Sequence, residues 1–318
     1  MSATHSKGPT DGFPPLPPAF EGYADESLAQ APAGGPGKNG LLEATFAREG
    51  ANPTRLIRDH VKVPYHLTGT LESDPAPGLT TLVAQEPTGG VAQGDRHRMV
   101  IDARAGSRAH VTTQSATKVH SMSANYAHLD ASLRAEAGSY LEYLPGATII
   151  NEDARCLQTV RVDLADDACV IVGDILVPDG LSDHEPFSFD HYHARVEAEH
   201  DGRLVCADAV DLRPSERNPQ DSASVGEYGV VGSLYVFVPA SSDGTAEFRL
   251  EELVEGIYDR ISNREGVQAG VSTLPHEVGA VVRILGHREA DVTETLRAAW
   301  DETRQQRLGV GAPADRRY

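Results

Sequence analysis

The 318-residue sequence is poor in cysteine, in basic residues and in long apolar runs, and each shortage excludes a class of protein. Cys156, Cys169 and Cys206 lie far apart without CxxC spacing, which argues against a disulfide framework or a zinc knuckle. No run approaches the roughly 18 apolar residues of a membrane span. The N-terminus also lacks a basic segment followed by an apolar stretch. We therefore expect a cytoplasmic protein with no membrane contact.

The shortage of basic residues gives the chain a strong negative charge. Lys and Arg total 28 against 47 Asp and Glu, for a formal charge of -19. Such a charge repels nucleic acid and anionic lipid, so we expect no nucleic-acid partner and regard a basic or cationic partner as more compatible.

Nucleotide-binding loops are absent as well. Gly89-Gly90 and Gly94 would let backbone N–H groups approach a phosphate, but Gly94 is followed by Asp95-Arg96 instead of the Lys and Ser or Thr of a Walker loop. No GxGxxG occurs. These glycines are predicted to form structural turns.

The N-terminal segment has a composition of its own, with seven Pro and seven Gly in the first 40 residues and no apolar periodicity. We predict a disordered extension over residues 1–50. A β-rich domain is expected over residues 51–310 and a flexible tail over 311–318.

Short β-type segments dominate the centre of the chain. Asp201-Gly202 suits a tight hairpin turn, and the residues before it alternate between apolar and polar from His191 to Glu199. The runs 168–172 and 175–177 are almost continuously apolar, as in strands covered on both faces.

Two helices are predicted near the C-terminus. Residues 248–261 carry apolar side chains at three- and four-residue spacing, and a second helix is expected to begin at Asp291 in a capping box that ends at Glu294. Between them, residues 267–274 and 278–285 are predicted to form two strands joined at Pro275-His276. The patterns alone indicate a mainly β protein with some α-helix.

Two segments carry candidate chemistry. Residues 111–119 are predicted to form one strand rich in short polar side chains, with Lys118 neutralising a carboxylate such as Glu142. His191 and His193 would point the same way from one strand, so they could chelate a metal ion with oxygen from Glu185 or Glu197. The alternatives are a solvated polar strand face and a cupin-like metalloenzyme, whose flanking glycines do not match here.

An ordered series of motifs resembles the urease accessory protein family UreD, also called UreH. Its centre is residues 109–122 (AHVTTQSATKVHSM), followed by residues 140–145 (YLEYLP). The other members of the series are Gly89-Gly90, Gly94-Asp95, Glu185-Pro186-Phe187, residues 283–286 and Trp300. The sequence departs from the family at Leu181, where the family has Arg beside Gly180. The resemblance spans roughly residues 60–307.

This resemblance implies an irregular, β-helix-like winding of many short strands with two α-helices. It also implies a non-enzymatic urease maturation factor that joins UreF and the GTPase UreG to apo-urease, in a dimeric heterocomplex formed through UreF. Nickel would pass through transiently, without a tightly bound cofactor. A metal-dependent enzyme built on the histidine pair and a β-rich interaction protein unrelated to nickel remain the alternatives.

Site residues follow from the same resemblance. Carboxylates and polar groups are expected to line a nickel passage, and an apolar helix face is expected to bind UreF. The passage residues are Glu142, Glu185, Lys118, Asp95 and Thr117; the partner-binding residues are Ile257, Tyr258, Leu296 and Trp300.

Overall fold

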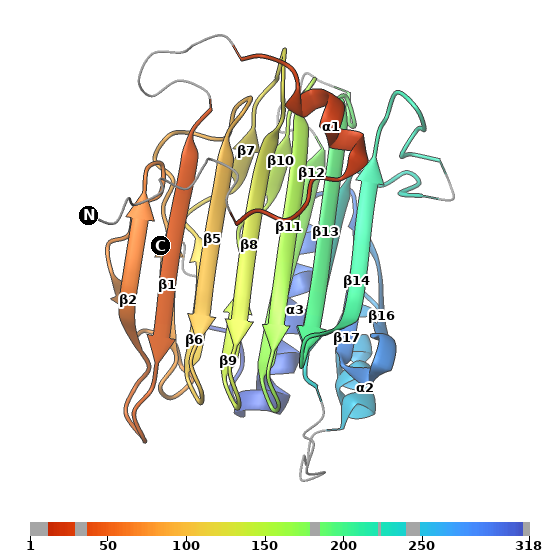
Figure 1. Ribbon diagram of the computed structural model, residues 1–318. Coiled ribbons are helices and arrows are strands. Elements are labelled where there is room, and N and C mark those ends of the chain that lie inside the picture. The colour runs from red at the N-terminus through yellow and green to blue at the C-terminus, as the bar shows by residue number, and fades with distance from the viewer. Residues whose placement is uncertain (1–11, 29–36, 179–184, 222–223, 240–248, 314–318) are drawn as a thin grey trace, which may run out of the picture.

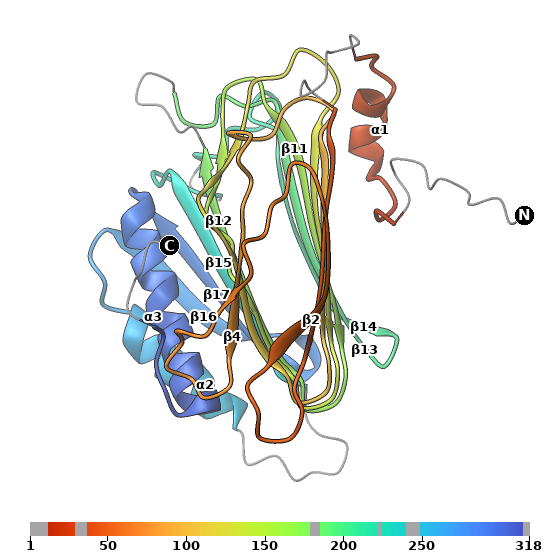
Figure 2. The same ribbon diagram turned by 90° about the vertical axis from the view of Figure 1, so that its left-hand side faces the viewer.

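Two large β-sheets stacked face to face make up most of the protein (Figures 1 and 2). The computed structural model describes residues 12–28, 37–178, 185–221, 224–239 and 249–313. The seven-stranded sheet has the order β14 (Arg203–Leu212), β13 (His191–His200), β11 (Arg155–Leu164), β8 (Ala127–Ala135), β5 (Arg96–Ala103), β1 (Asn39–Ala47) and β2 (Arg55–Lys62). The ten-stranded sheet has the order β16 (Val267–Thr273), β17 (Gly279–Gly286), β15 (Val230–Phe237), β12 (Cys169–Pro178), β9 (Tyr140–Tyr143), β6 (Arg108–Thr113), β4 (Thr80–Ala84) and β3 (Thr70–Leu71). Off this path, β10 (Thr148–Ile150) pairs with β12, and β7 (Thr117–Val119) pairs with β10.

The chain winds between the sheets in stacked coils. β5 is followed by β6 in the opposite sheet, β8 by β9, and β11 by β12. Successive coils place β5, β8, β11 and β13 parallel to one another, and likewise β4, β6, β9 and β12. This confirms the predicted β-helix-like winding. Alternating apolar residues face the space between the sheets, where they form one core.

Helices cover the outer faces of both sheets (Figure 2). α2 (Leu250–Ile261) and α3 (Glu289–Leu308) pack on the ten-stranded sheet and enclose a second core. Both were predicted, as were the strands between them, now β16 and β17 around a short 3-10 helix (Pro275–Glu277). The capping box at Asp291 was wrong, because α3 begins two residues earlier and its N-cap residue Arg288 makes no side-chain cap.

A third helix and a sheet strand correct the prediction of a disordered N-terminus. β1 lies within the seven-stranded sheet, and α1 (Pro18–Ala24) lies on that sheet's outer face. Phe20 on α1 is fully buried against Tyr126 and Leu157. Residues 1–11 lie outside the described residues. At the other end, part of the predicted tail is packed, since the Ala312 N–H donates to Asp301 at 2.8 Å.

Ionic contacts fix the segment that carries α1. Glu26 accepts a hydrogen bond from Arg155 at 2.7 Å and another from the backbone N–H of Asn125 at 2.7 Å. Arg155 also lies over the Tyr23 ring, 4.5 Å from its centroid. No helix in the described parts of the chain is both long and apolar enough to cross a membrane.

Removing residues 1–28 is expected to lower the melting temperature by several degrees. Burial of Phe20 contributes about 1.5–3 kcal/mol, and 1 kcal/mol shifts the melting temperature by about 2–4 °C in a domain of roughly this size. Thermal unfolding followed by circular dichroism measures the change. A chain lacking only residues 1–11 is the control and keeps these contacts. An unchanged melting temperature in the longer truncation would contradict the packing role of α1.

Candidate functional site

A cavity of about 260 Å³ lies between the two sheets, where several motifs of the sequence meet. Residues 113–118 form one wall, and Met99 and Leu129 of the opposite sheet form another. The lining is completed by Tyr65, Ala84, Glu86 and the pair Gly89-Gly90. Two of the predicted passage residues, Thr117 and Lys118, are therefore at this cavity.

The polar wall is a bend instead of the single strand that was predicted. β6 ends at Thr113 and β7 begins at Thr117. Between them, the Thr113 hydroxyl donates to the Ser115 carbonyl at 2.8 Å and accepts from the Gly146 N–H at 2.9 Å. These local hydrogen bonds compete with a continuous strand and turn the segment toward the cavity.

The predicted turn at Gly89-Gly90 packs directly on β7. The Val91 N–H donates to the Lys118 carbonyl at 2.7 Å, and the His120 N–H donates to the Val91 carbonyl at 2.9 Å. Gly89 and Gly90 both have positive φ, as the turn interpretation requires. A Cβ on Gly90 would lie 2.5 Å from the Lys118 carbonyl oxygen. The glycine pair thus lets the turn approach the strand closely.

Asp95 is separated from Glu86 of the cavity lining by the His97 ring, and its oxygens are already engaged. It is fully buried and accepts hydrogen bonds from the backbone N–H groups of Lys38, at 2.7 Å, and Ala92, at 2.9 Å. His97 is also buried, with ring nitrogens 3.8 Å from Glu86 and 3.9 Å from Asp95. Burial lowers the pKa of His97 below its usual value, so its imidazole is neutral at pH 7.

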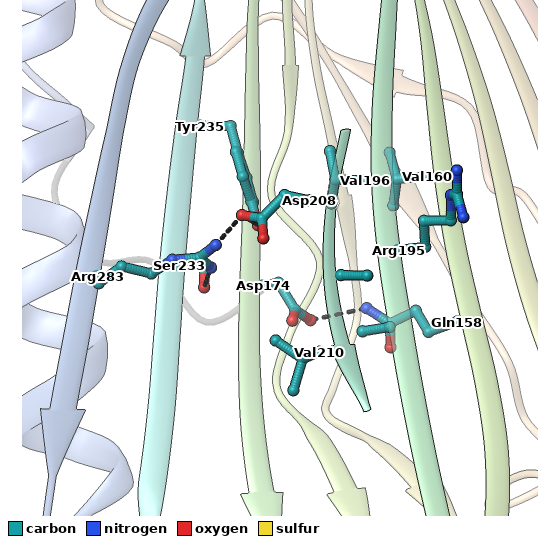
Figure 3. Close-up of a pocket in the computed structure, with 12 residues that line it drawn as sticks. Gln158, Val160, Asp174, Arg195, Val196, Asp208, Val210, Ser233, Tyr235 and Arg283 are labelled. Atoms are coloured by element: carbon teal, nitrogen blue, oxygen red, sulfur yellow. Dashed lines mark hydrogen bonds and ion pairs between the residues drawn. The ribbon is translucent and has the colours of Figure 1, made fainter. Parts of the chain in front are cut away.

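A series of polar side chains leads from the cavity across the interior. Thr117 is paired with Thr148 on β10. The Thr148 hydroxyl donates to Gln158 at 3.2 Å, and the Gln158 amide donates to Asp174 at 2.7 Å (Figure 3). Asp174 lines a second space of about 20 Å³, enough for about one water. Burial raises the pKa of Asp174.

Arg283 belongs to the motif at residues 283–286, and its side chain reaches the same space from β17. Its guanidinium forms an ion pair with Asp208 and a hydrogen bond with Ser233 (Figure 3). Tyr235 donates to the same carboxylate at 2.9 Å. The interior between the sheets is therefore polar at both ends of the series.

Glu142 lies on the other side of the ten-stranded sheet, beneath α3. It is fully buried and accepts hydrogen bonds from Tyr140 at 2.6 Å, Trp300 at 2.9 Å and Arg304 at 3.1 Å. His110 Nδ1 lies 2.8 Å from its second oxygen. The expected pairing with Lys118 was wrong, because Arg304 supplies the compensating charge.

The structure does not bring Glu185 to the cavity, since this residue is exposed in the loop before β13. Gly180 and Leu181 lie outside the described residues. Of the predicted partner-binding residues, Ile257, Leu296 and Trp300 are buried against the sheet. Their apolar faces belong to the core, so only Tyr258, which is 54% exposed, is available to a partner.

The histidine pair lies on the outer face of the seven-stranded sheet, under α1. His191 Nε2 lies 2.6 Å from Asp211 Oδ1, and His193 Nδ1 lies 3.9 Å from the same atom. Asp211 on β14 takes the place expected for Glu185 or Glu197. A cupin-like enzyme requires a metal site in its interior. Here the sheets are largely parallel and the histidine pair faces outward, so the arrangement differs from that of a cupin.

Comparisons with known proteins agree on one family. The family model described as "UreD urease accessory protein" matches residues 38–317. A urease accessory protein UreD of Natronomonas pharaonis is 63% identical over 303 residues, which cover 95% of this chain and 99% of that protein. The UreD of Haloquadratum walsbyi is 54% identical, with 96% and 97% covered, and that of Haloarcula marismortui is 42% identical, with 95% and 98% covered.

Proposed function

Because this chain belongs to the UreD family of urease accessory proteins, we propose that it is a non-catalytic maturation factor of urease. In this role it joins the accessory proteins UreF and UreG to apo-urease in the cytoplasm, in a dimeric heterocomplex formed through UreF. Nickel is the cargo and passes through the protein without remaining bound.

The polar series between the sheets is the observation that supports nickel passage. From the cavity at Thr117 and Lys118, a series of paired and hydrogen-bonded polar residues leads through Thr148 and Gln158 to Asp174. Oxygen atoms spaced in this way can replace part of the hydration shell of a divalent cation. None of these contacts forms a closed, deep site, and transfer requires that the ion can also leave.

This route carries less negative charge than expected, because Glu142 does not lie on it. Glu142 already has several donors beneath α3, and its carboxylate holds the helix to the sheet. The route therefore depends on neutral hydroxyl and amide oxygens, with Glu86 at its start and Asp174 further along it.

Gln158→Leu is expected to slow urease activation roughly three- to tenfold at limiting nickel. The change removes one polar contact from the route, and a lost contact of about 1 kcal/mol corresponds to roughly a fivefold change in rate. Urease activity is measured in a reconstituted system over a range of nickel concentrations, with assembly checked by gel filtration.

Gln268→Leu is the matched control, because Gln268 lies exposed on β16. It should activate urease at the normal rate. If Gln158→Leu assembles and activates normally at limiting nickel, the route through this residue is wrong, while membership of the family stands. Loss of assembly in both variants would indicate a fault in complex formation instead.

A further inference from the structure

The outer face of the seven-stranded sheet brings together three metal-ligating side chains, on the opposite face of the sheet from Gln158 of the interior route. His191 and His193 point the same way from β13, and Asp211 lies opposite His193 on β14. Their potential ligand atoms all lie within 4.8 Å of one another. Two imidazoles and one carboxylate are typical ligands of divalent first-row transition metals.

Several of these nitrogens lack a hydrogen-bond partner among the described residues. They are Nδ1 of His191 and both ring nitrogens of His193. The His191 side chain is only 1% exposed, and the fully buried Phe20 ring lies 4.3 Å from it, centroid to centroid. His191 Nε2, by contrast, contacts Asp211 at 2.6 Å and Arg213 Nε at 3.4 Å. Buried polar atoms normally have partners, so the unpartnered ring nitrogens of His193 beside this carboxylate call for a ligand.

From this geometry we propose that His191, His193 and Asp211 bind a divalent transition-metal ion beneath α1. An ion held at about 2.0–2.2 Å separates neighbouring ligand atoms by roughly 3.0–3.5 Å. The distances of 2.6 Å and 3.9 Å from Asp211 Oδ1 to the two histidines lie on either side of this value. Side-chain movements of less than about 1 Å would therefore bring Asp211 Oδ1 to a ligand's separation from each histidine.

Arg213 orients the carboxylate without occupying its ligand atom. Its guanidinium donates to Asp211 Oδ2 at 2.9 Å, which leaves Oδ1 directed at the histidines. Arg213 also forms an ion pair with Glu216 at 3.3 Å, so two carboxylates share its positive charge. Hydrogen bonds of this kind, made to a ligand's other oxygen, hold metal ligands in orientation. The site is independent of the proposed nickel route.

Titration of the full-length protein with Zn(II) and Co(II) tests the site. Competition with a chromophoric chelator should show one high-affinity equivalent, and Co(II) should give the absorption spectrum of nitrogen and oxygen ligands. His193→Ala should weaken binding by at least about 100-fold, since even removing a residue that only hydrogen-bonds a metal ligand costs about 10- to 100-fold. Zn(II) should raise the melting temperature of the wild-type protein but not of this variant.

His200→Ala is the matched control. His200 belongs to a second His and Asp cluster, with Asp166 and Asp201, at the far end of β13. Wild-type affinity in this control supports the site at His193, whereas loss of binding would move the site and overturn the proposal. Should His193→Ala fail to fold, Asp211→Asn keeps the shape of the carboxylate and carries the same expectation. Unchanged binding in either ligand variant, or no binding by the wild-type protein at micromolar Zn(II), would also overturn it.

Discussion

Replacing Arg304 by leucine is expected to reduce the free energy of unfolding by about 3–5 kcal/mol. Arg304 is fully buried on α3 and forms ion pairs with both Glu142 and Asp74. Their side chains are 0% and 1% exposed, so water cannot replace the lost guanidinium. The variant keeps two buried carboxylates without their cation, which costs far more than the pair itself contributes. Urea unfolding measures the loss.

Arg260→Leu is the matched control on the same layer. Arg260 on α2 pairs with Glu302 of α3 at 3.1 Å, but its side chain is 50% exposed. An exposed pair contributes about 0–1 kcal/mol, so the control should unfold almost as the wild-type protein does. Equal and small losses in both variants would show that the buried ions do not hold α3 to the sheet.

The decrease of the free energy of unfolding at acid pH offers a second measurement of the same network. Burial alone would raise the pKa of Glu142, but the hydrogen bond from His110 and the charge of Arg304 outweigh it and lower the pKa. A carboxyl group with a lowered pKa stabilises the folded state above its ordinary pKa of about 4.3, and this contribution is lost as the pH falls through the folded value. Glu142→Gln should remove this part of the acid dependence.

The winding of the chain could be predicted only through the family resemblance, whereas single elements followed from local patterns. The hairpin at Asp201-Gly202 formed as expected, and the four alternating apolar residues before it are buried. The many Pro and Gly residues before β1 hid this strand from the prediction. The strand expected over 111–119 was wrong for another reason, because local hydroxyl hydrogen bonds interrupt it. Yet Leu42, Ala44 and Phe46 alternate with polar residues and are all buried, so the signal for β1 was present.

Asp211 could not have been predicted as the third member of the histidine cluster. In a regular hairpin His200 pairs with Arg203 and His193 would pair with Val210. A β-bulge between Ala198 and Glu199 shifts the register by one residue and places Asp211 opposite His193. Because a one-residue shift exchanges the faces of a strand, the bulge alone turns the carboxylate outward to the histidines.

Buried ion networks pose a similar limit. Glu142 was recognised as a carboxylate that needs a partner if buried. Its partner Arg304 lies 162 residues further along the chain, and Asp74 lies 230 residues before Arg304. No local spacing connects them. Only the docking of α3 on the ten-stranded sheet brings the three charges together.

Gly90→Ala is expected to destabilise the protein much more than Gly89→Ala and to disturb the cavity. Both glycines have positive φ, at 134° and 80° respectively, so either substitution adds backbone strain of about 1–3 kcal/mol. The surroundings differ. A Cβ on Gly89 meets no atom within 4 Å, whereas one on Gly90 lies 2.5 Å from the Lys118 carbonyl oxygen.

The clash at Gly90 involves backbone, so no side chain can move aside to relieve it. Either the turn or β7 must shift, at a further cost of about 1–3 kcal/mol. Such a shift would break the hydrogen bond from the Val91 N–H to Lys118 and move Thr117 relative to Thr148. Urea unfolding and nickel-dependent urease activation should both be impaired in Gly90→Ala, with Gly89→Ala closer to wild type in both. Equal effects in the two variants would mean that glycine is required at both positions by the positive φ of the turn, and not by the close contact of the turn with β7.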